Sequence, residues 1–152
     1  MTCKLRRLCL VNLILSWLVP LLSYGQSANA VVGTWLTKEK DAHIQIMQQG
    51  DRIEGRLVWA KEAKDGLGKP KVDVKNPNVR LRSQPVLGMQ FMRDFVYTGN
   101  NQYENGTIYD ARNGKTYKCK LTLTDKNTLD VRGYVGAAWM GLGRTTTWTR
   151  VN

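Results

Sequence analysis

The side chains of this sequence that could perform catalysis or bind metals are scattered along the chain. His43 is the single histidine, and the alternation of apolar and polar residues around it predicts a position on the outward face of a strand. A Ser-His-Asp or Cys-His arrangement and a histidine metal cluster are therefore not expected. Cys119 alternates with apolar neighbours and is predicted to be a small buried hydrophobic residue rather than a reactive thiol. We predict no catalytic residue, no metal site and no cofactor.

Asp110 and Tyr117 form the most suggestive polar pair. A hairpin that turns at Asn113-Gly114 would place them opposite each other near one rim of a sheet. Such a pair is either architectural or orients the polar head of a ligand. A hydrolase or isomerase that uses Asp110, Tyr117 and Arg132 is a further alternative, which is disfavoured because Arg132 has the opposite strand parity to its apolar neighbours.

The segment 62–85 does not resemble a hairpin loop, because it is long and holds three of the four prolines. It carries six lysines and arginines against three acidic residues. We interpret it either as a solvated flexible loop or as a lid over a barrel mouth, with Asn76 in a rigid turn and Arg80 and Arg82 placed to meet an anionic head group. Trp139, in the glycine-rich connection 135–143, would form the other rim of that mouth or anchor its own loop.

Three hairpins give the framework for these residues. The first turns at Gly50-Asp51, the second at Asn113-Gly114 and the third through a three-residue loop, 125–127, in which Asn127 suits a positive φ. The predicted cross-strand pairs are Gln48 with Ile53, Ile46 with Gly55, Ile44 with Leu57, Ala42 with Trp59, Asp110 with Tyr117, Ile108 with Cys119, Gly106 with Leu121, Leu123 with Leu129, Leu121 with Val131, and Cys119 with Gly133.

The hairpins agree on which face is apolar, and three further strands are expected at 31–37, 91–98 and 144–151. No segment shows sustained helical periodicity. Eight antiparallel strands with one apolar face most simply close into an up-and-down barrel, which removes the sheet edges. The fold class is therefore predicted as all-β, an eight-stranded antiparallel barrel, with a two-sheet sandwich as the alternative.

The first 25 residues have the three-part build of a secretory signal, with Lys4, Arg6 and Arg7 before an apolar run that is shorter than the roughly 20 residues of a spanning helix. We expect cleavage after Gly25, or as late as Ala30, and a single barrel domain over 26–152. The mature protein is then exported, to the periplasm or beyond the cell, with no transmembrane segment. Three positive charges leave with the signal, so that the formal charge falls from +11 to +8.

Several motifs identify a resemblance. The opening G-T-W, with Gly33 and Trp35, is similar to the G-x-W of lipocalin and calycin barrels, in which a basic residue of the last strand lies across the tryptophan. The closing G-R-T-T-T-W-T-R offers Arg144 and Arg150 for that role, and Trp148 shares their parity. These motifs, with R-I-E-G-R-L-V-W, G-T-I-Y-D, N-G-K-T-Y and V-R-G-Y-V-G between them, resemble an exported bacterial family catalogued as a domain of unknown function, number two-one-four-seven. The resemblance implies a lipocalin-like barrel, closed by Gly33, Trp35, Arg144 or Arg150, and Trp148, and implies no established reaction.

We expect Trp35, Trp59 and Trp148 to fill the barrel; the alternative is that Trp148 points outward and threonine methyls pack inside. The leading functional hypothesis is an exported, non-enzymatic barrel that binds a small apolar or amphipathic molecule, or an anionic envelope component. The alternative is a filled barrel whose basic loops bind a cell-wall polymer or a protein. Nucleic acid is not favoured as a partner, since the basic residues lack alternating exposed aromatics.

Overall fold

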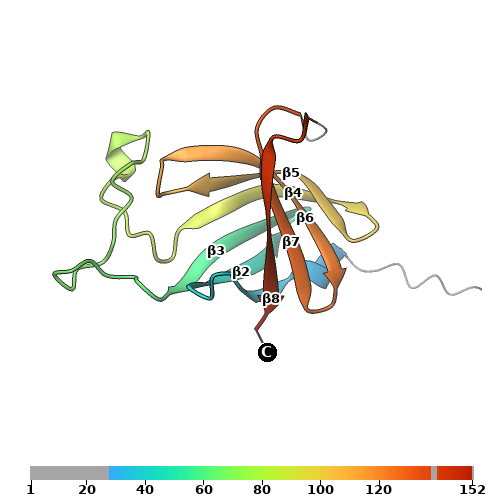
Figure 1. Cartoon of the computed structure of the whole chain (residues 1–152), viewed down its shortest axis with the longest axis horizontal. Helices are drawn as coiled ribbons and strands as arrows, with labels where there is room; N and C mark the ends of the chain where they lie inside the picture. The colour runs from blue at the N-terminus through green and yellow to red at the C-terminus, as the bar shows by residue number, and fades with distance from the viewer. Residues whose placement is uncertain (1–27, 138–139, 152) are drawn as a thin grey trace, which may run out of the picture.

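The structure, a computed structural model, describes residues 28–137 and 140–151, and it is a closed antiparallel barrel in which each strand pairs with its neighbours in sequence and β8 returns to β1 (Figure 1). The predicted all-β, eight-stranded up-and-down fold is confirmed. Among the described elements, the short 3-10 helix η1 precedes β1 and the short 3-10 helix η2 lies between β3 and β4. The strands are β1 (Gly33–Leu36), β2 (Ala42–Gln49), β3 (Arg52–Ala60), β4 (Gln90–Gly99), β5 (Gln102–Asp110), β6 (Lys115–Asp125), β7 (Thr128–Tyr134) and β8 (Gly143–Arg150), and the helices are η1 (Ala28–Val31) and η2 (Val79–Leu81).

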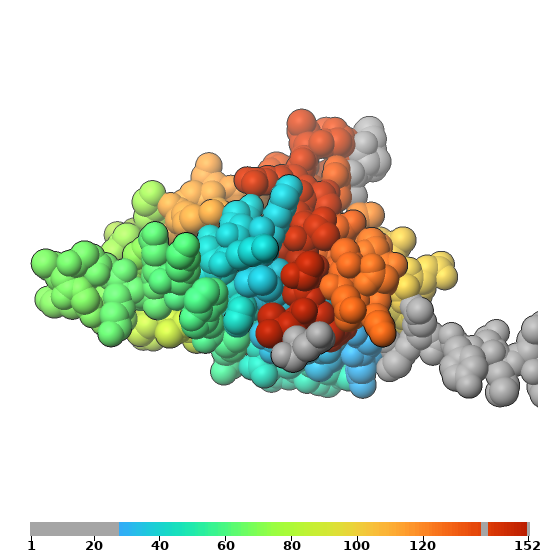
Figure 2. All heavy atoms as spheres, turned by 60° about the horizontal axis from the view of Figure 1, so that its bottom comes forward, coloured from blue at the N-terminus to red at the C-terminus, as the bar shows by residue number. Residues whose placement is uncertain are grey.

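The two ends of the barrel are built differently. One end, here the closed end, gathers η1, three tight turns and the end of β8. The opposite end, here the open end, carries the longer connections, 37–41, 61–89, 111–114 and 135–142. The connection 61–89, here the arm, projects from the barrel as the green mass in Figure 2. Up-and-down topology sends alternate connections to the same end, and the longer ones of this chain are those of the open end.

The β2–β3 hairpin confirms the predicted register for most of its length and departs from it at one bulge. Gln48 pairs with Ile53, Ile46 with Gly55 and Ile44 with Leu57, but the register shifts between His43 and Ile44. Trp59 consequently pairs with His43 instead of Ala42, and its ring lies 4.7 Å from the imidazole. Because an extra residue turns every later side chain to the other face, Trp59 is 43% exposed. The prediction that it fills the barrel is wrong.

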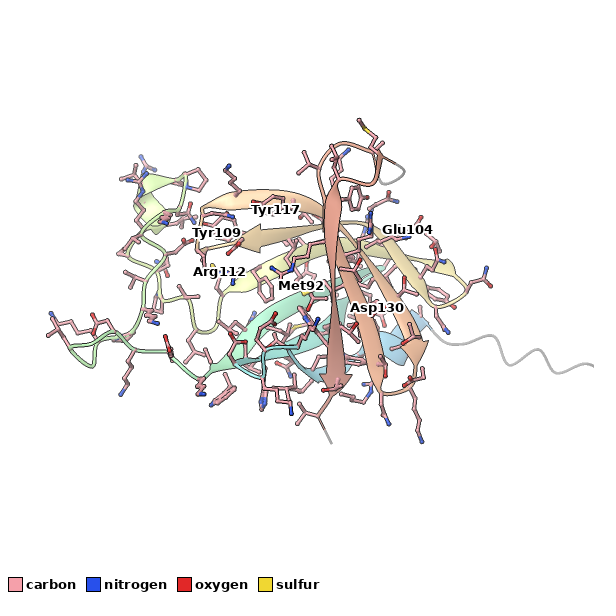
Figure 3. All side chains as sticks on the ribbon, viewed as in Figure 1. Met92, Glu104, Tyr109, Arg112, Tyr117 and Asp130 are labelled. Carbon is pink, nitrogen blue, oxygen red and sulfur yellow. The ribbon has the colours of Figure 1, made fainter. Side chains whose placement is uncertain are left out.

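The β5–β6 hairpin has a longer turn than predicted. The Asp110 carbonyl accepts a backbone hydrogen bond from Gly114, and the Asp110 carboxylate accepts one from the backbone of Arg112. These bonds hold a four-residue loop, so that Asp110 pairs with Lys115 and Ile108 with Tyr117. The predicted pairs of Asp110 with Tyr117, Ile108 with Cys119 and Gly106 with Leu121 are therefore wrong by two residues, a shift that leaves each side chain on its predicted face. Figure 3 labels Arg112 and Tyr117 at this end of the hairpin.

The β6–β7 hairpin confirms all three predicted pairs, Leu123 with Leu129, Leu121 with Val131 and Cys119 with Gly133, although the turn itself is the two residues between Asp125 and Thr128. Asn127 is not among the described residues with positive φ, against the prediction. Trp148 pairs with Leu129 and is 4% exposed, so it points inward. The interior is packed with Val31, Trp35, Ile44, Ile46, Ile53, Met92, Phe95, Tyr103, Cys119, Leu121, Leu123, Leu129, Val131 and Trp148.

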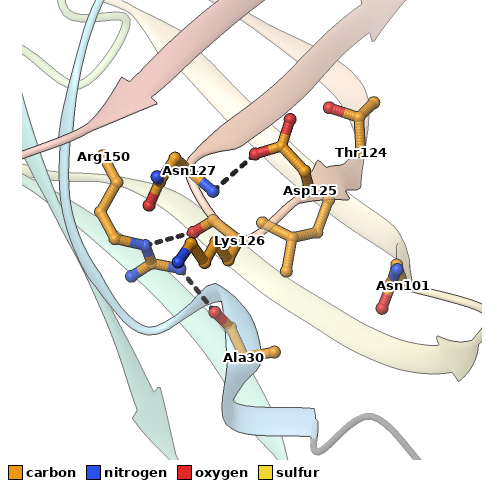
Figure 4. A pocket seen from close by; sticks show the side chains of 8 residues that line it. Ala30, Asn101, Thr124, Asp125, Lys126, Asn127 and Arg150 are labelled. Atoms are coloured by element: carbon orange, nitrogen blue, oxygen red, sulfur yellow. Dashed lines mark hydrogen bonds between the residues drawn. The ribbon is translucent and has the colours of Figure 1, made fainter.

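Arg150 seals the closed end (Figure 4). Its guanidinium lies 4.2 Å from the ring centroid of the fully buried Trp35, a cation–π geometry. The same guanidinium donates hydrogen bonds to three carbonyl oxygens, those of Lys126 at 2.7 Å, Val32 at 2.8 Å and Ala30 at 2.7 Å. Arg150 thereby ties the start of the barrel, its third tight turn and its last strand together.

Gly33 and Arg144 are the remaining residues of the motifs predicted to close the barrel. Gly33 has φ +143°, and a Cβ there would overlap the Arg150 guanidinium, so the close approach requires glycine. Of the two arginines that the sequence offers for closure, Arg144 does not take the position. It lies at the open end, where its exposed side chain is 3.7 Å from Glu39.

Replacing Arg150 by methionine removes the charge and leaves three carbonyl groups without their donor. We expect the free energy of unfolding to fall by about 2 to 4 kcal/mol, measured by denaturant titration. Arg144→Met on the same strand is the matched control, because its ion pair is exposed and is expected to contribute less than about 0.5 kcal/mol. Equal losses in the two variants, or an Arg150→Met protein as stable as the parent, would contradict this role.

Candidate functional site

Two cavities of about 430 Å³ each lie at opposite ends of the barrel. The first is beside Arg150 at the closed end, between Asn101 and the β6–β7 turn (Figure 4). The guanidinium of Arg150 is already committed to three carbonyls, and Asp125 accepts a bond from the backbone of Asn127 at 2.7 Å. Arg150 is therefore committed to closure and Asp125 to its own turn, whereas the side-chain oxygen of Asn101 in the same lining is buried without a partner.

The second cavity lies at the open end, where the arm meets the end of β3 and the β5–β6 turn. We call it the rim groove. Its volume falls within the range of sites for small ligands, and most of its lining side chains are apolar. The apolar wall includes Leu57, Pro70, Val72, Val86, Leu87 and Ala111.

Charged side chains complete the rim groove. Lys71 donates to Glu62 at 3.0 Å, and this contact lowers the pKa of the Glu62 carboxyl. Arg112 donates two bonds to Asp110, at 3.0 and 3.3 Å, and this carboxylate raises the pKa of the guanidinium. Both cations are exposed, so water screens these pairs and an anion can compete for either cation at small cost.

A buried carboxylate fixes the arm to the barrel. Asp73 is 1% exposed, and it accepts hydrogen bonds from the Tyr109 hydroxyl at 2.9 Å and from the Asn76 amide at 2.7 Å. Tyr109 belongs to β5, whereas Asp73 and Asn76 belong to the arm. Burial, and then the bond to Asp73, raise the pKa of Tyr109 to about 12. Neutral donors therefore satisfy the buried Asp73 side chain at the junction of arm and barrel.

The β5–β6 turn packs closely against the arm near this junction. Gly114 has φ +72°, and a Cβ there would overlap the backbone carbonyl oxygen of Lys75. Two isolated bridges, Lys64 with Pro70 and Val72 with Pro85, give the arm internal pairing. The interpretation of a solvated flexible loop is therefore wrong for this part of the arm, because its base is hydrogen-bonded and packed.

The predicted ligand residues of the arm do not line the rim groove. Asn76 uses its side chain within the arm, donating to Asp73 and accepting from the Asn78 backbone at 2.9 Å. Arg82 donates to the Asn76 carbonyl at 2.8 Å, and Arg80 is exposed on η2. Asn76 thus acts in the turn that the sequence predicted, while the two arginines face solvent.

Asp110, Tyr117 and Arg132 do not converge on one pocket. Asn113 bridges the first two, donating to the Asp110 carboxylate at 3.2 Å and to the Tyr117 hydroxyl at 2.9 Å. Arg132 lies on β7, where its side chain is 3.4 Å from the Thr145 hydroxyl. The architectural reading of the Asp110 and Tyr117 pair fits these contacts. Trp139 lies outside the described residues.

The remaining candidates for chemistry are the Cys119 thiol and groups of possible metal ligands. Burial raises the pKa of the Cys119 thiol to about 12, so it stays protonated at neutral pH. The described residues contain no group of three or more potential metal ligands. None of the helices in the described ranges is long and apolar enough to cross a membrane.

The pairing of Asp73 with Tyr109 was not predicted from the sequence. The alternation of β5 puts Tyr109 on the face opposite to Ile108, but Asp73 lies 36 residues earlier, in a segment without periodicity. Local patterns cannot specify a contact at that separation. The one available signal was an acidic residue, with Asn76 three residues later, within an otherwise basic segment.

Comparison with known proteins places the chain in a family. A family model described as an uncharacterized protein conserved in bacteria (DUF2147) matches residues 33–150, from the first strand to the last. A search of curated proteins finds no match. Among solved structures, the chain is similar to protein HP1028 of Helicobacter pylori, described as belonging to the lipocalin family, with 23% identity and a TM-score of 0.70 over 80% of this chain and 82% of that one. That similarity shows the fold alone. The chain therefore belongs to the DUF2147 family, with a lipocalin-like barrel as its structure.

Proposed function

We propose that this protein is an exported, non-enzymatic binding protein that holds a small amphipathic molecule in the rim groove. The observation that carries the proposal is the combination, in one cavity of about 430 Å³, of an apolar wall with two exposed cations, Lys71 and Arg112. An aliphatic or aromatic body would lie against Val72 and Leu87. An anionic head would replace Glu62 or Asp110 as the partner of a cation.

The barrel interior favours this location over the lumen. The side chains of Trp35, Phe95, Tyr103 and Trp148 occupy the centre, each at most 4% exposed. An eight-stranded barrel has an interior that its own side chains can fill. The amphipathic ligand therefore belongs at the rim, where the arm adds a wall that the strands do not provide. Export rests on the predicted signal at residues 1–25, which lies outside the described residues.

Decanoate tests the groove, because it joins an aliphatic chain to a carboxylate. We expect saturable binding to the purified mature protein, with NMR shifts confined to amides of the groove. Leu87→Glu is expected to weaken binding roughly tenfold or more, since it brings a like charge into the apolar wall. Lys71→Met should weaken decanoate binding more than decanol binding.

The matched control is Val135→Glu, an exposed apolar residue at the same end but outside the groove. It should bind decanoate as the parent does. Non-saturable binding of decanoate, or an equal loss with Val135→Glu, would contradict the proposal.

The anchoring of the arm gives a second prediction. Tyr109→Phe removes one donor from the buried Asp73 carboxylate, and the unmet bond costs about 1 to 3 kcal/mol. We expect local opening of the arm, seen as roughly tenfold faster tryptic cleavage at its lysines and arginines and as faster amide exchange around Asp73. Tyr117→Phe, on the same hairpin, is the control, because its hydroxyl contacts Asn113 and not the arm. Unchanged cleavage in Tyr109→Phe would show that packing alone holds the arm.

A further inference from the structure

The exposed large apolar side chains are concentrated at the open end. Within the described ranges they lie at the end of β3, on the arm and in the β7–β8 connection: Val58, Trp59, Leu67, Val74, Val79, Leu81, Leu87, Val135, Met140 and Leu142. The tight turns of the closed end contribute none of them. Single exposed apolar residues are ordinary, whereas a set confined to one end indicates an interaction surface.

The arm also carries a dense set of cations. Its exposed lysines and arginines are Lys61, Lys64, Lys69, Lys71, Lys75, Arg80 and Arg82. Its acidic residues are Glu62 and Asp65, which are exposed, and Asp73, which is buried. Among the seven cations, Lys71 alone forms an ion pair with a carboxylate of the described chain. The exposed surface of the arm is therefore strongly positive.

Two structured turns of the arm each present an aliphatic side chain between cations. Leu67, 84% exposed, is at the tip of a turn in which the Asp65 carboxylate accepts bonds from the backbones of Leu67 and Lys69, both at 2.9 Å. Val79, 69% exposed, begins η2, which Asn78 caps by accepting a bond from the Arg80 backbone at 3.1 Å. Hydrogen bonds from the backbone to Asp65 and Asn78 therefore fix the two turns, at which Leu67 and Val79 are exposed.

This arrangement matches the chemistry of an anionic lipid surface. Aliphatic side chains enter the boundary between head groups and acyl chains, and neighbouring cations attract anionic head groups. Each lysine or arginine close to such a surface strengthens binding roughly fivefold. Nucleic acid fits less well, because the arm contains no aromatic residue on which bases could stack.

We propose that the arm docks the barrel on an anionic lipid bilayer, with Leu67 and Val79 inserted into the interface and the cations of both turns against the head groups. The arm projects from the barrel in both views, so that a flat surface can approach its tips (Figures 1 and 2). The rim groove lies at the base of the same arm. Docking would bring the groove close to the bilayer, although the docking itself does not depend on a ligand in the groove.

Sedimentation with lipid vesicles tests the proposal on the mature protein. We expect binding to vesicles of phosphatidylcholine with phosphatidylglycerol and at least tenfold weaker binding to phosphatidylcholine alone. Binding should also weaken as salt rises from about 0.1 M to about 1 M, where the screening length falls from about 10 Å to about 3 Å. Equal binding to both vesicles, or to neither, would overturn the proposal.

Two double variants separate the apolar and the charged contributions. Leu67→Ser with Val79→Ser, and Lys69→Gln with Arg80→Gln, should each weaken binding to the anionic vesicles severalfold to tenfold. Val135→Ser with Leu142→Ser is the matched control at the same end but off the arm, and it should bind as the parent does. Full binding of Leu67→Ser with Val79→Ser to the vesicles would contradict the proposal. So would binding of heparin or RNA to this variant as tight as the binding of the parent to the vesicles, because charge alone would then explain the interaction.

Decanoate binding distinguishes this proposal from that of the rim groove. Leu67→Ser with Val79→Ser leaves the groove intact and should retain the affinity of the parent for decanoate. Loss of vesicle binding with decanoate binding retained supports docking by the arm as a separate property of the protein.

Discussion

The guanidinium of Arg150 is the contact on which closure of the barrel depends. β1 has only four residues, and it pairs with β8 at two positions, Trp35 with Arg150 and Leu36 with Thr149. So short a ladder leaves carbonyl groups just before β1 without strand partners. Arg150 donates hydrogen bonds to two of them, those of Ala30 and Val32, and its guanidinium lies over the ring of Trp35. Gly33 follows from the same geometry, because a side chain there would occupy the place of the guanidinium.

Closure at one end leaves the other end to carry function. The closed end consists of tight turns and groups committed to sealing, and large side chains fill the centre of the barrel. Variation without loss of the core is therefore possible mainly in the connections of the open end. The arm, the rim groove and the large exposed apolar residues of the described chain all lie there.

Local patterns in the sequence predicted the fold because hairpins are local. The β6–β7 pairs and the β2–β3 pairs from Ile44 to Gln48 follow from alternation and turn position. The errors have specific causes. A bulge beside His43 turned Trp59 outward. Hydrogen bonds from backbone amides to Asp110 lengthened the β5–β6 turn by two residues. Alternation is silent on bulges, so the face of Trp59 was predicted wrongly, whereas the two-residue shift of the β5–β6 hairpin left the predicted faces unchanged.

The candidate site was less predictable because non-local contacts build it. The long, basic segment was identified from length and composition, but its attachment through Asp73 and Tyr109 joins residues that no local pattern links. Arg80 and Arg82 were expected to meet a ligand, and they face solvent while Lys71 and Arg112 line the groove. The composition therefore indicated the charge of the arm without indicating which cations line the groove.

The charge distribution of the arm, like its projecting shape, favours contact with an anionic partner. Asp73 is a buried carboxylate within a segment that holds seven cations, yet no described lysine or arginine forms an ion pair with it. Burying the neighbouring Lys75 beside it would add the desolvation cost of a second charged group. Tyr109 and Asn76 satisfy Asp73 instead, and the cations stay in solvent. Hydrogen bonds from neutral groups anchor the arm, and its positive charge remains available to an anionic partner.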